Sequence, residues 1–369
     1  MNNNRLPLQL AFIFILFSFM NSVNACTSVR IKAKDTDVIY GRTMEFAQDL
    51  QSSIIYVPEG VTYQGTTAPG VTDGKKWQVK YPFTGVSAYH LPHAVDGVNT
   101  QGLAVGILFF PNYAQYPVPT PTNKPIGIAP WELGTYLLSN FATIAQVIEG
   151  LKSVVVLGVP LTKDGSIPQY HYTVHDAKGN SLVIEYVGGE LTTFENHLGV
   201  LTNSPTFDWH VTNLRNYVNL TVNNVPPINI SGTELIGFGQ GTGLLGLPGD
   251  FTPPSRFVRA VAFTQSSVPS MTGYDAIFHV FHIMNQFDIP KGAVRSKEGT
   301  NTLMEYTQWT TASNLKDKTY FYRTYLHSQI HKIDLTKMSP KIKKIQWYPM
   351  SKDVNYFKEV TEFSDSIKG

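Results

Sequence analysis

The chain has 369 residues, of which 42% are hydrophobic and 15% are charged, and this balance excludes intrinsic disorder and fibrous folds. Its 29 basic and 27 acidic residues leave a formal net charge of +2, without a run of five like charges. This charge pattern therefore indicates no nucleic-acid partner. The lone cysteine, Cys26, excludes an internal disulfide and every metal site built from several thiolates.

The first 25 residues have the pattern of a secretory signal peptide. Arg5 precedes an apolar run over residues 8–19, which is too short to span a bilayer as a stable anchor. Short side chains precede an expected cut after Ala25. We therefore predict a signal peptide over residues 1–25 and one catalytic domain over 26–369. The mature chain is expected to be exported, periplasmic or secreted, with no stable membrane anchor.

Cleavage after Ala25 makes Cys26 the first residue of the mature chain, and a cysteine there has two interpretations. As a lipobox cysteine it would carry a diacylglycerol, and the product would be a lipid-anchored exported binding protein. Asn24 argues against this, because lipoboxes usually place a small residue there. As an N-terminal nucleophile it would use its own α-amino group, of pKa ~8, as general base for the thiol. The local sequence alone favours the lipid anchor, because the terminal cysteine of an exported chain is more often a tether than a nucleophile.

Strands predominate in the pattern of the mature chain, with a few helices. Alternating residues over 26–33 and 38–44 flank a turn at 35–37 and predict a hairpin at the start. Further strands are predicted over 102–110, 171–174, 181–186, 319–325 and 331–335. Helical periodicity covers 131–152, with a break near Asn140 and a capping box at Thr143 and Gln146, and also 256–263 and 274–287. These elements predict an α+β fold.

Two apparent motifs do not indicate a cofactor or a metal. The Gly-x-Gly-x-x-Gly pattern at 241–246 matches a dinucleotide fingerprint, but Pro-Gly-Asp follows where a helix should continue, so we predict a glycine-rich loop. His279 with His282, and His171 with His175, lack a nearby Glu in a zinc-ligand pattern. We therefore predict structural histidines, no metal and no cofactor.

Four spaced blocks occur in order along nearly the whole mature chain. They are residues 26–30 with 40–46, residues 102–111, residues 200–208, and residues 246–250 leading into 254–257. Together they resemble the choloylglycine hydrolase family, which contains bile salt hydrolases and penicillin V acylases. The resemblance implies a four-layer αββα sandwich of the N-terminal nucleophile hydrolase type that cleaves a linear amide C–N bond. It favours the nucleophile over the lipid anchor for Cys26.

The resemblance also implies the roles of the site residues. Cys26 would attack the carbonyl carbon, and Arg42 beside it would favour the thiolate over the thiol. The oxyanion hole would comprise the side-chain amide of Asn203 and the backbone N–H of Phe109. Met44 is assigned to the substrate-binding side of the site.

Arg256 carries over as the second active-site arginine, whose fork is expected to bind Glu45 or Asn203. The family usually has Asp where this chain has Glu45, the carboxylate expected to hold the α-amino group. Phe109 stands where bile salt hydrolases typically carry Asn and penicillin V acylases Tyr, so its ring offers only apolar or stacking contact.

From these observations we expect an N-terminal cysteine amidohydrolase that acts on a small-molecule N-acyl amide. Conjugated bile salts are the first substrate class, and the alternatives are penicillin V and N-acyl-homoserine lactones. The lipid-anchored exported binding protein is the alternative that is not an enzyme. The family resemblance further implies a homotetramer.

Overall fold

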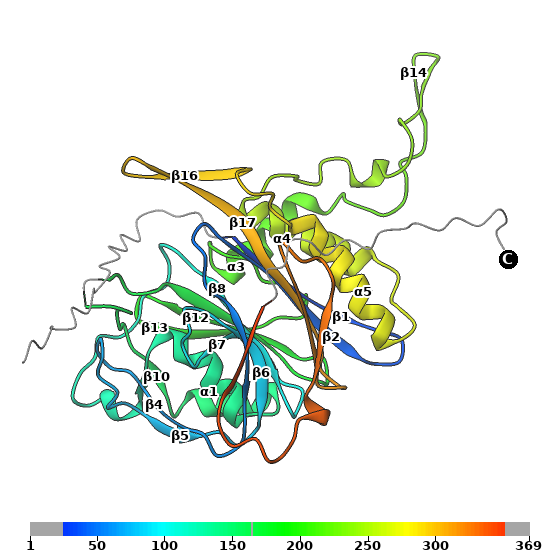
Figure 1. The fold of residues 1–369 in the computed structure, drawn as a ribbon. Coiled ribbons are helices and arrows are strands. Elements are labelled where there is room, and N and C mark those ends of the chain that lie inside the picture. Colours follow the sequence, from blue (N-terminus) through cyan, green and yellow to red (C-terminus); the bar gives the residue numbers. More distant parts are fainter. Residues whose placement is uncertain (1–24, 164, 351–369) are drawn as a thin grey trace, which may run out of the picture.

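The computed structural model describes residues 25–163 and 165–350, which form two antiparallel sheets packed face to face (Figure 1). Helices cover the outer face of each sheet, and the described chain therefore has four main layers. Except for Ala25, the predicted signal peptide over residues 1–25 lies outside the described residues.

The first sheet has six strands and contains the N-terminal hairpin. Its order is β1, β2, β17, β18 and β19, and β16 pairs with the first part of β17. The strands are β1 (Cys26–Lys32), β2 (Val38–Phe46), β16 (Val294–Glu298), β17 (Asn301–Asn314), β18 (Thr319–Thr324) and β19 (His331–Asp334). The pairing of β17 with β2 shifts register between Thr307 and Trp309, which marks a bulge beside the N-terminal hairpin.

The second sheet has eight strands, in the order β13, β12, β11, β8, β7, β6, β3 and β20. The strands are β3 (Ser53–Val57), β6 (Phe83–Ser87), β7 (Ala94–Asn99), β8 (Ala104–Phe109), β11 (Tyr170–His175), β12 (Ser181–Val187), β13 (Glu190–Glu195) and β20 (Gln346–Pro349). Its central strands are buried on both faces, which explains why they lack a polar alternation in the sequence.

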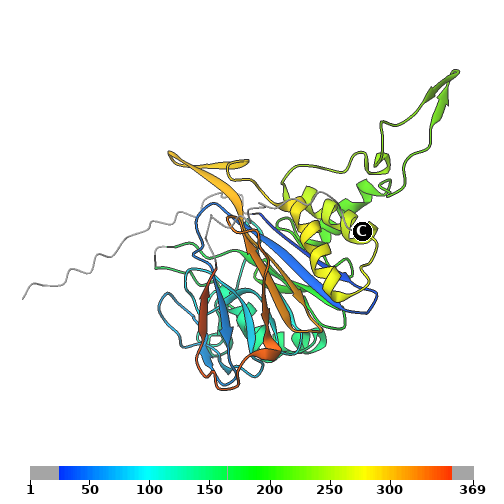
Figure 2. The same ribbon diagram turned by 45° about the vertical axis from the view of Figure 1, so that its right-hand side comes forward.

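Helices flank both sheets (Figures 1 and 2). They are α1 (Leu133–Asn140), α2 (Ile144–Leu151), α3 (Phe207–Asn213), α4 (Pro253–Ser266) and α5 (Gly273–Met284). The six-stranded sheet carries α4 and α5, and α1 packs on β7 and β8 of the eight-stranded sheet. Gly41 permits the close approach of α5, because a Cβ atom there would collide with Val280. The predicted α+β fold with an αββα sandwich is confirmed.

Three short two-stranded sheets lie outside these layers. They are β4 (Thr62–Gln64) with β5 (Lys76–Gln78), β9 (Gly127–Ile128) with β10 (Val155–Val156), and β14 (Ile228–Ile230) with β15 (Thr233–Leu235). The hairpin of β14 and β15 projects far from the body of the molecule in both views (Figures 1 and 2). Residues 218–247, which carry this hairpin, are called the arm below.

The predicted elements agree with the observed ones in type and approximate position. The hairpin at 26–44 is β1 and β2, and the helical region 131–152 is divided into α1 and α2. Thr143 caps α2 by accepting the Gln146 N–H, as predicted, but the Gln146 side chain accepts from Ala142 N–H rather than from Thr143. In the part of the chain that the structure describes, no helix is both long and apolar enough to cross a membrane.

A buried carboxylate, Asp96 of β7, joins the two sheets. Its Oδ1 atom accepts from Tyr40 of β2 at 2.7 Å, and its Oδ2 atom accepts from Thr311 of β17 at 2.9 Å and from Tyr320 of β18. All three donors belong to the opposite sheet. Because Asp96 is almost wholly buried, these hydroxyls replace the water that the carboxylate loses on folding.

We expect Asp96→Asn to lower the free energy of unfolding by about 1–3 kcal/mol, because the amide nitrogen cannot accept the hydrogen bonds that one carboxylate oxygen accepts. Urea unfolding measures this effect. Glu59→Gln, at an exposed position, is the control and should leave the midpoint unchanged. An unchanged midpoint for Asp96→Asn would show that this junction contributes nothing to stability.

Candidate active site

The Cys26 residue begins β1 and is buried between the two sheets. It lies opposite Met44 of β2, with its sulfur 3.9 Å from the Met44 sulfur. On the other side of β1, Ser28 exchanges backbone hydrogen bonds with Leu201, at 2.8 and 3.1 Å. The strand that carries the thiol is thus paired with β2 on one side and bridged to Leu201 on the other, and the segment that follows Leu201 is brought next to Cys26.

The guanidinium of Arg42 lies beside the thiol, 3.3 Å from Nη2 to the Cys26 sulfur. Its Nη1 atom donates to the backbone carbonyls of Ile107 at 2.6 Å and Val95 at 3.2 Å. Both carbonyls belong to the eight-stranded sheet, whereas Arg42 itself lies on β2. The charge next to the nucleophile is therefore fixed by both sheets.

The Arg256 guanidinium, from α4, organises the opposite side of Cys26. Its Nη1 atom donates to the Cys26 carbonyl oxygen and, at 2.9 Å, to the Thr27 hydroxyl. Its Nη2 atom donates to Asn203 Oδ1 at 2.7 Å, and Cys26 N–H donates to the same oxygen at 2.8 Å. Arg256 was expected to bind Glu45 or Asn203, and the structure shows the hydrogen bond to Asn203.

These contacts orient the Asn203 side chain, because an oxygen that accepts from two donors cannot be the amide nitrogen. The Nδ2 atom therefore faces the Phe109 carbonyl oxygen, to which it donates at 2.7 Å. The backbone N–H of Phe109 points at the Cys26 sulfur. Phe109, the last residue of β8, thus accepts a hydrogen bond from the Asn203 amide at its carbonyl oxygen and donates from its N–H toward the Cys26 thiol.

The Glu45 carboxylate is buried at the end of β2. Its Oε1 atom accepts from the Thr307 hydroxyl at 3.0 Å, and its backbone N–H donates to the Ala25 carbonyl at 3.0 Å. Burial raises the pKa of Glu45 to about 7, against the opposing charge of Arg256. A contact of this carboxylate with the α-amino group stays a prediction, because the Cys26 nitrogen is bonded to Ala25 in the described chain.

A second buried carboxylate, Glu305 of β17, was not found from the sequence. Neither of its oxygens has a hydrogen-bond partner among the described residues. Burial raises its pKa to about 8, with Arg256 lowering it and Glu45 raising it further. No local sequence signal places Glu305 beside Glu45, because 260 residues separate them and the bulged strand β17 brings them together.

The electrostatic balance at the thiol disfavours its ionised form. Burial raises the pKa of the Cys26 thiol, and Glu45 raises it further. Arg42, the Phe109 N–H and Arg256 oppose this shift without cancelling it. The thiol therefore needs a proton acceptor before it can attack a carbonyl carbon.

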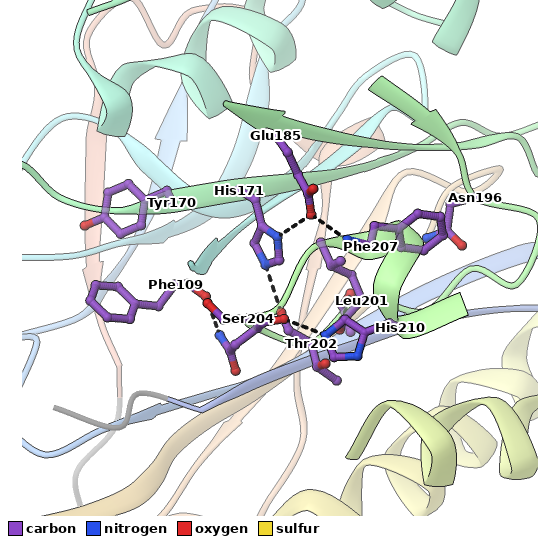
Figure 3. Close-up of polar contacts among 12 residues, drawn as sticks. Phe109, Tyr170, His171, Glu185, Asn196, Leu201, Thr202, Ser204, Phe207 and His210 are labelled. Atoms are coloured by element: carbon purple, nitrogen blue, oxygen red, sulfur yellow. Dashed lines mark hydrogen bonds and ion pairs between the residues drawn. The ribbon is translucent and has the colours of Figure 1, made fainter. Parts of the chain in front are cut away.

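A largely apolar pocket opens at Cys26. Its aromatic lining consists of Phe46, Tyr89, Phe109, Trp131 and Tyr170. Its aliphatic lining includes Leu50, Leu91, Val95, Ile107 and Leu161, and Met44, Glu45 and His93 also border it. Figure 3 shows the rings of Phe109 and Tyr170 on one side of the site, and their centroids lie 6.3 Å apart in an edge-to-face arrangement. Such a wall suits an apolar acyl group next to the nucleophile.

The structure thus brings Cys26 together with every residue assigned from the resemblance, namely Arg42, Met44, Glu45, Phe109, Asn203 and Arg256. The predicted glycine-rich loop at 241–246 lies in the arm. Within residues 25–163 and 165–350, no group of three or more His, Cys, Asp or Glu side chains is arranged to hold a metal ion.

Comparison with known proteins agrees with this geometry. A family model described as linear amide C–N hydrolases, choloylglycine hydrolase family, matches residues 26–344, so that the match begins at Cys26. The bile salt hydrolase/transferase of Clostridium perfringens is 33% identical over 335 residues, which are 89% of this chain and 98% of that protein. The penicillin V acylase of Pectobacterium atrosepticum is 25% identical over 320 residues, 82% of this chain and 78% of that protein.

Solved structures show the same architecture. A mutant of the conjugated bile acid hydrolase from Clostridium perfringens matches with a TM-score of 0.79 at 32% identity, covering 89% of this chain and 97% of that one. The penicillin V acylase from Agrobacterium tumefaciens matches with a TM-score of 0.71 at 24% identity, covering 87% and 90%, and shares the fold.

We expect Arg42→Met to raise the pKa of the Cys26 thiol, because the variant removes the nearest positive charge. Below that pKa, each unit of increase lowers the thiolate fraction, and hence the alkylation rate, about tenfold. The rate of iodoacetamide alkylation against pH measures this directly, since Cys26 is the only cysteine. Arg30→Met, on β1, is the control, and we expect it to leave the dependence of the alkylation rate on pH unchanged. An unshifted profile for Arg42→Met would contradict the assignment.

Proposed function

We propose that this chain, which belongs to the choloylglycine hydrolase family of linear amide C–N hydrolases, is an N-terminal cysteine amidohydrolase that acts on conjugated bile salts. The observation that carries the proposal is the buried thiol of Cys26 in the lining of an apolar pocket, with the Arg42 guanidinium 3.3 Å from its sulfur and the Phe109 N–H as a further donor to it. The aromatic and aliphatic lining of this pocket suits the apolar acyl part of such a substrate.

The reaction needs a base for the thiol, and the α-amino group of a mature chain beginning at Cys26 supplies one. The amine takes the thiol proton, and the thiolate attacks the carbonyl carbon. The Phe109 N–H and the second N–H of Asn203 Nδ2 then stabilise the oxyanion. The leaving amine takes the proton from the α-ammonium. A water molecule next gives one proton to the α-amine and attacks the thioester carbon. The C–S bond breaks, the acid is released, and the departing Cys26 thiolate takes the proton back from the α-ammonium.

The substrate preference draws on the relatives and on the pocket. The bile salt hydrolase/transferase of Clostridium perfringens covers more of this chain, at higher identity, than the penicillin V acylase of Pectobacterium atrosepticum. The aromatic pair of Phe109 and Tyr170 favours penicillin V, with its phenoxyacetyl group, as a second candidate, since it offers a ring edge and face inside the pocket. N-acyl-homoserine lactones are the third.

A substrate panel tests this proposal. Glycocholate, taurocholate, penicillin V and a long-chain acyl-homoserine lactone are assayed side by side with purified mature enzyme. We expect the highest kcat/KM for a bile salt and no turnover by Cys26→Ala, which removes the nucleophile without adding bulk. A Cys26→Ala variant that keeps more than a few per cent of the activity would contradict the mechanism, and a higher kcat/KM for another substrate would contradict the preference.

The mechanism requires removal of Ala25, and we propose that export and signal-peptide cleavage expose Cys26. The processed product, residues 26–369, would act as one catalytic domain in the periplasm or outside the cell. The raised pKa of the thiol supports this, because an amide nitrogen between Ala25 and Cys26 cannot accept the thiol proton.

We therefore expect a protein that starts Met-Ala-Cys to fold but to stay inactive until both leading residues are trimmed. Intact mass and activity are followed together during trimming by an aminopeptidase. The control is the Cys26→Ala variant carried through the same treatment. Full activity of untrimmed protein would show that another group acts as the base.

We also propose that the chain forms a homotetramer, in which the arm of one copy packs against a neighbouring copy. Several of its apolar side chains are exposed, including Val218, Ile236, Phe238 and Leu245. An apolar groove at its base is lined by Leu214, Val258 and Val261, among others. Exposed apolar surface of this kind indicates an interface, and a projecting hairpin reaches a second copy more readily than its own body.

Light scattering coupled to size exclusion should give a mass four times that of the mature chain. We expect Phe238→Asp to shift the protein to smaller species, because a charge would be buried at the interface. Val118→Asp, at an exposed apolar position outside the arm, should not change the mass. A monomeric wild-type protein would contradict the proposed assembly.

A further inference from the structure

Two buried imidazoles contact consecutive carbonyl groups of the segment that carries Asn203 (Figure 3). His171 Nε2 lies 3.0 Å from the Thr202 carbonyl oxygen, and His210 Nε2 lies 2.8 Å from the Asn203 carbonyl oxygen. Both rings are fully buried. A carbonyl oxygen only accepts, so each Nε2 atom must carry a hydrogen. The tautomers of both rings are thereby fixed by the backbone.

The other nitrogen of His171 contacts a buried carboxyl group. His171 Nδ1 lies 3.2 Å from Glu185 Oε1, and the same oxygen accepts the Phe207 N–H at 3.1 Å (Figure 3). Because the Nε2 hydrogen of His171 is directed at Thr202, the contact between Nδ1 and Oε1 needs a second proton. The pair is therefore either imidazolium with carboxylate or imidazole with carboxylic acid, and it shares one proton in both forms.

Stacking holds both rings in place. His171 stacks on Phe110 with a centroid distance of 4.4 Å and an interplanar angle of 7°, and His210 stacks on Phe257 at 4.7 Å and 13°. Phe110 directly follows Phe109, whose carbonyl receives the Asn203 amide. The two imidazoles therefore fix the backbone of Asn203 relative to the strand that carries the other oxyanion donor.

Besides Glu185, the two imidazoles face each other, and Arg256 of α4 and Asp208 of α3 face His210. Burial, together with the charges of His171 and Arg256, lowers the pKa of His210 to about 4. His210 is thus neutral near pH 7, and a single hydrogen on Nε2 satisfies its contact with Asn203. The shared proton accordingly belongs to His171 and Glu185.

We propose that His171 and Glu185 form a buried proton-sharing pair that, together with His210, positions Asn203 to bind the oxyanion. These are positioning residues, because they act on the substrate only through the backbone of residues 202–203. The inference rests on the proposed amidase function, and it adds a role for a histidine that the sequence alone identifies as structural.

Substitutions at two histidines of the same strand test the proposal. His171→Asn removes the donor to Thr202, and we expect kcat to fall tenfold or more while KM changes less than threefold. Iodoacetamide alkylation of Cys26 should keep its wild-type rate, since the nucleophile is not touched. His171→Gln should regain part of the lost kcat, because its amide nitrogen reaches the place of Nε2.

The matched control is His175→Asn, at an equally buried site of β11 that contacts Thr173 and Ser181 instead. Its melting temperature should fall about as much as that of His171→Asn, but its kcat should stay within threefold of wild type. Equal losses of kcat in both variants, or wild-type kcat in His171→Asn, would overturn the proposal. A wild-type enzyme without amidase activity on any substrate would instead contradict the proposed function.

A second variant covers the case in which His171→Asn does not fold. Glu185→Gln keeps an oxygen at the position that faces both the Phe207 N–H and His171 Nδ1. That oxygen can accept from both groups only when His171 carries a hydrogen on each ring nitrogen and is therefore cationic. The ratio of its kcat to the wild-type kcat should therefore decline as pH rises, because only a ring with a hydrogen on each nitrogen donates to both Thr202 and residue 185. A purely structural defect lowers kcat by the same factor at every pH, and that result would also overturn the proposal.

Discussion

The guanidinium of Arg42 is the interaction on which the site depends, because it lies where the two sheets and the nucleophile meet. It comes from β2, binds the carbonyls of Ile107 and Val95 on the eight-stranded sheet, and reaches the Cys26 sulfur. A buried cation is tolerated only when its donors are satisfied. The same contacts that satisfy the charge therefore fix the distance between the sheets and the field at the thiol.

The other ionisable groups of the site surround the nucleophile together with Arg42. Arg256 binds the carbonyl of Cys26 and the oxygen of Asn203, and the buried carboxyl groups of Glu45 and Glu305 lie within its electrostatic reach. With pKa values raised to about 7 and 8, these carboxyl groups exchange protons in the range where an α-amine also titrates. The nucleophile thus lies among groups that change charge near neutral pH.

The sequence predicts those features that are local or that resemble a known motif. The hairpin around Cys26 follows from alternation, and Asn203 and Arg256 follow from the family resemblance. Glu305 and Glu185 could not be predicted, because a lone Glu on a strand has no pattern that distinguishes a buried carboxyl from an exposed one. The central strand β17 was not predicted either, because its sequence is polar and rich in threonine and lacks the apolar pattern of a buried strand. Its hydroxyl groups instead make buried hydrogen bonds between the sheets, as Thr311 does with Asp96.

The separation in sequence between site residues has a consequence for folding. Arg256 lies 230 residues from the carbonyl that it binds at Cys26, and Thr307 lies 262 residues from Glu45. Contacts of such high contact order form late, because long loops must close first. A chain still being synthesised has its cysteine but neither Arg256 nor β17 beside it. The site around Cys26 is therefore assembled only when the fold is complete, and a nascent chain carries the cysteine without the groups that surround it in the folded protein.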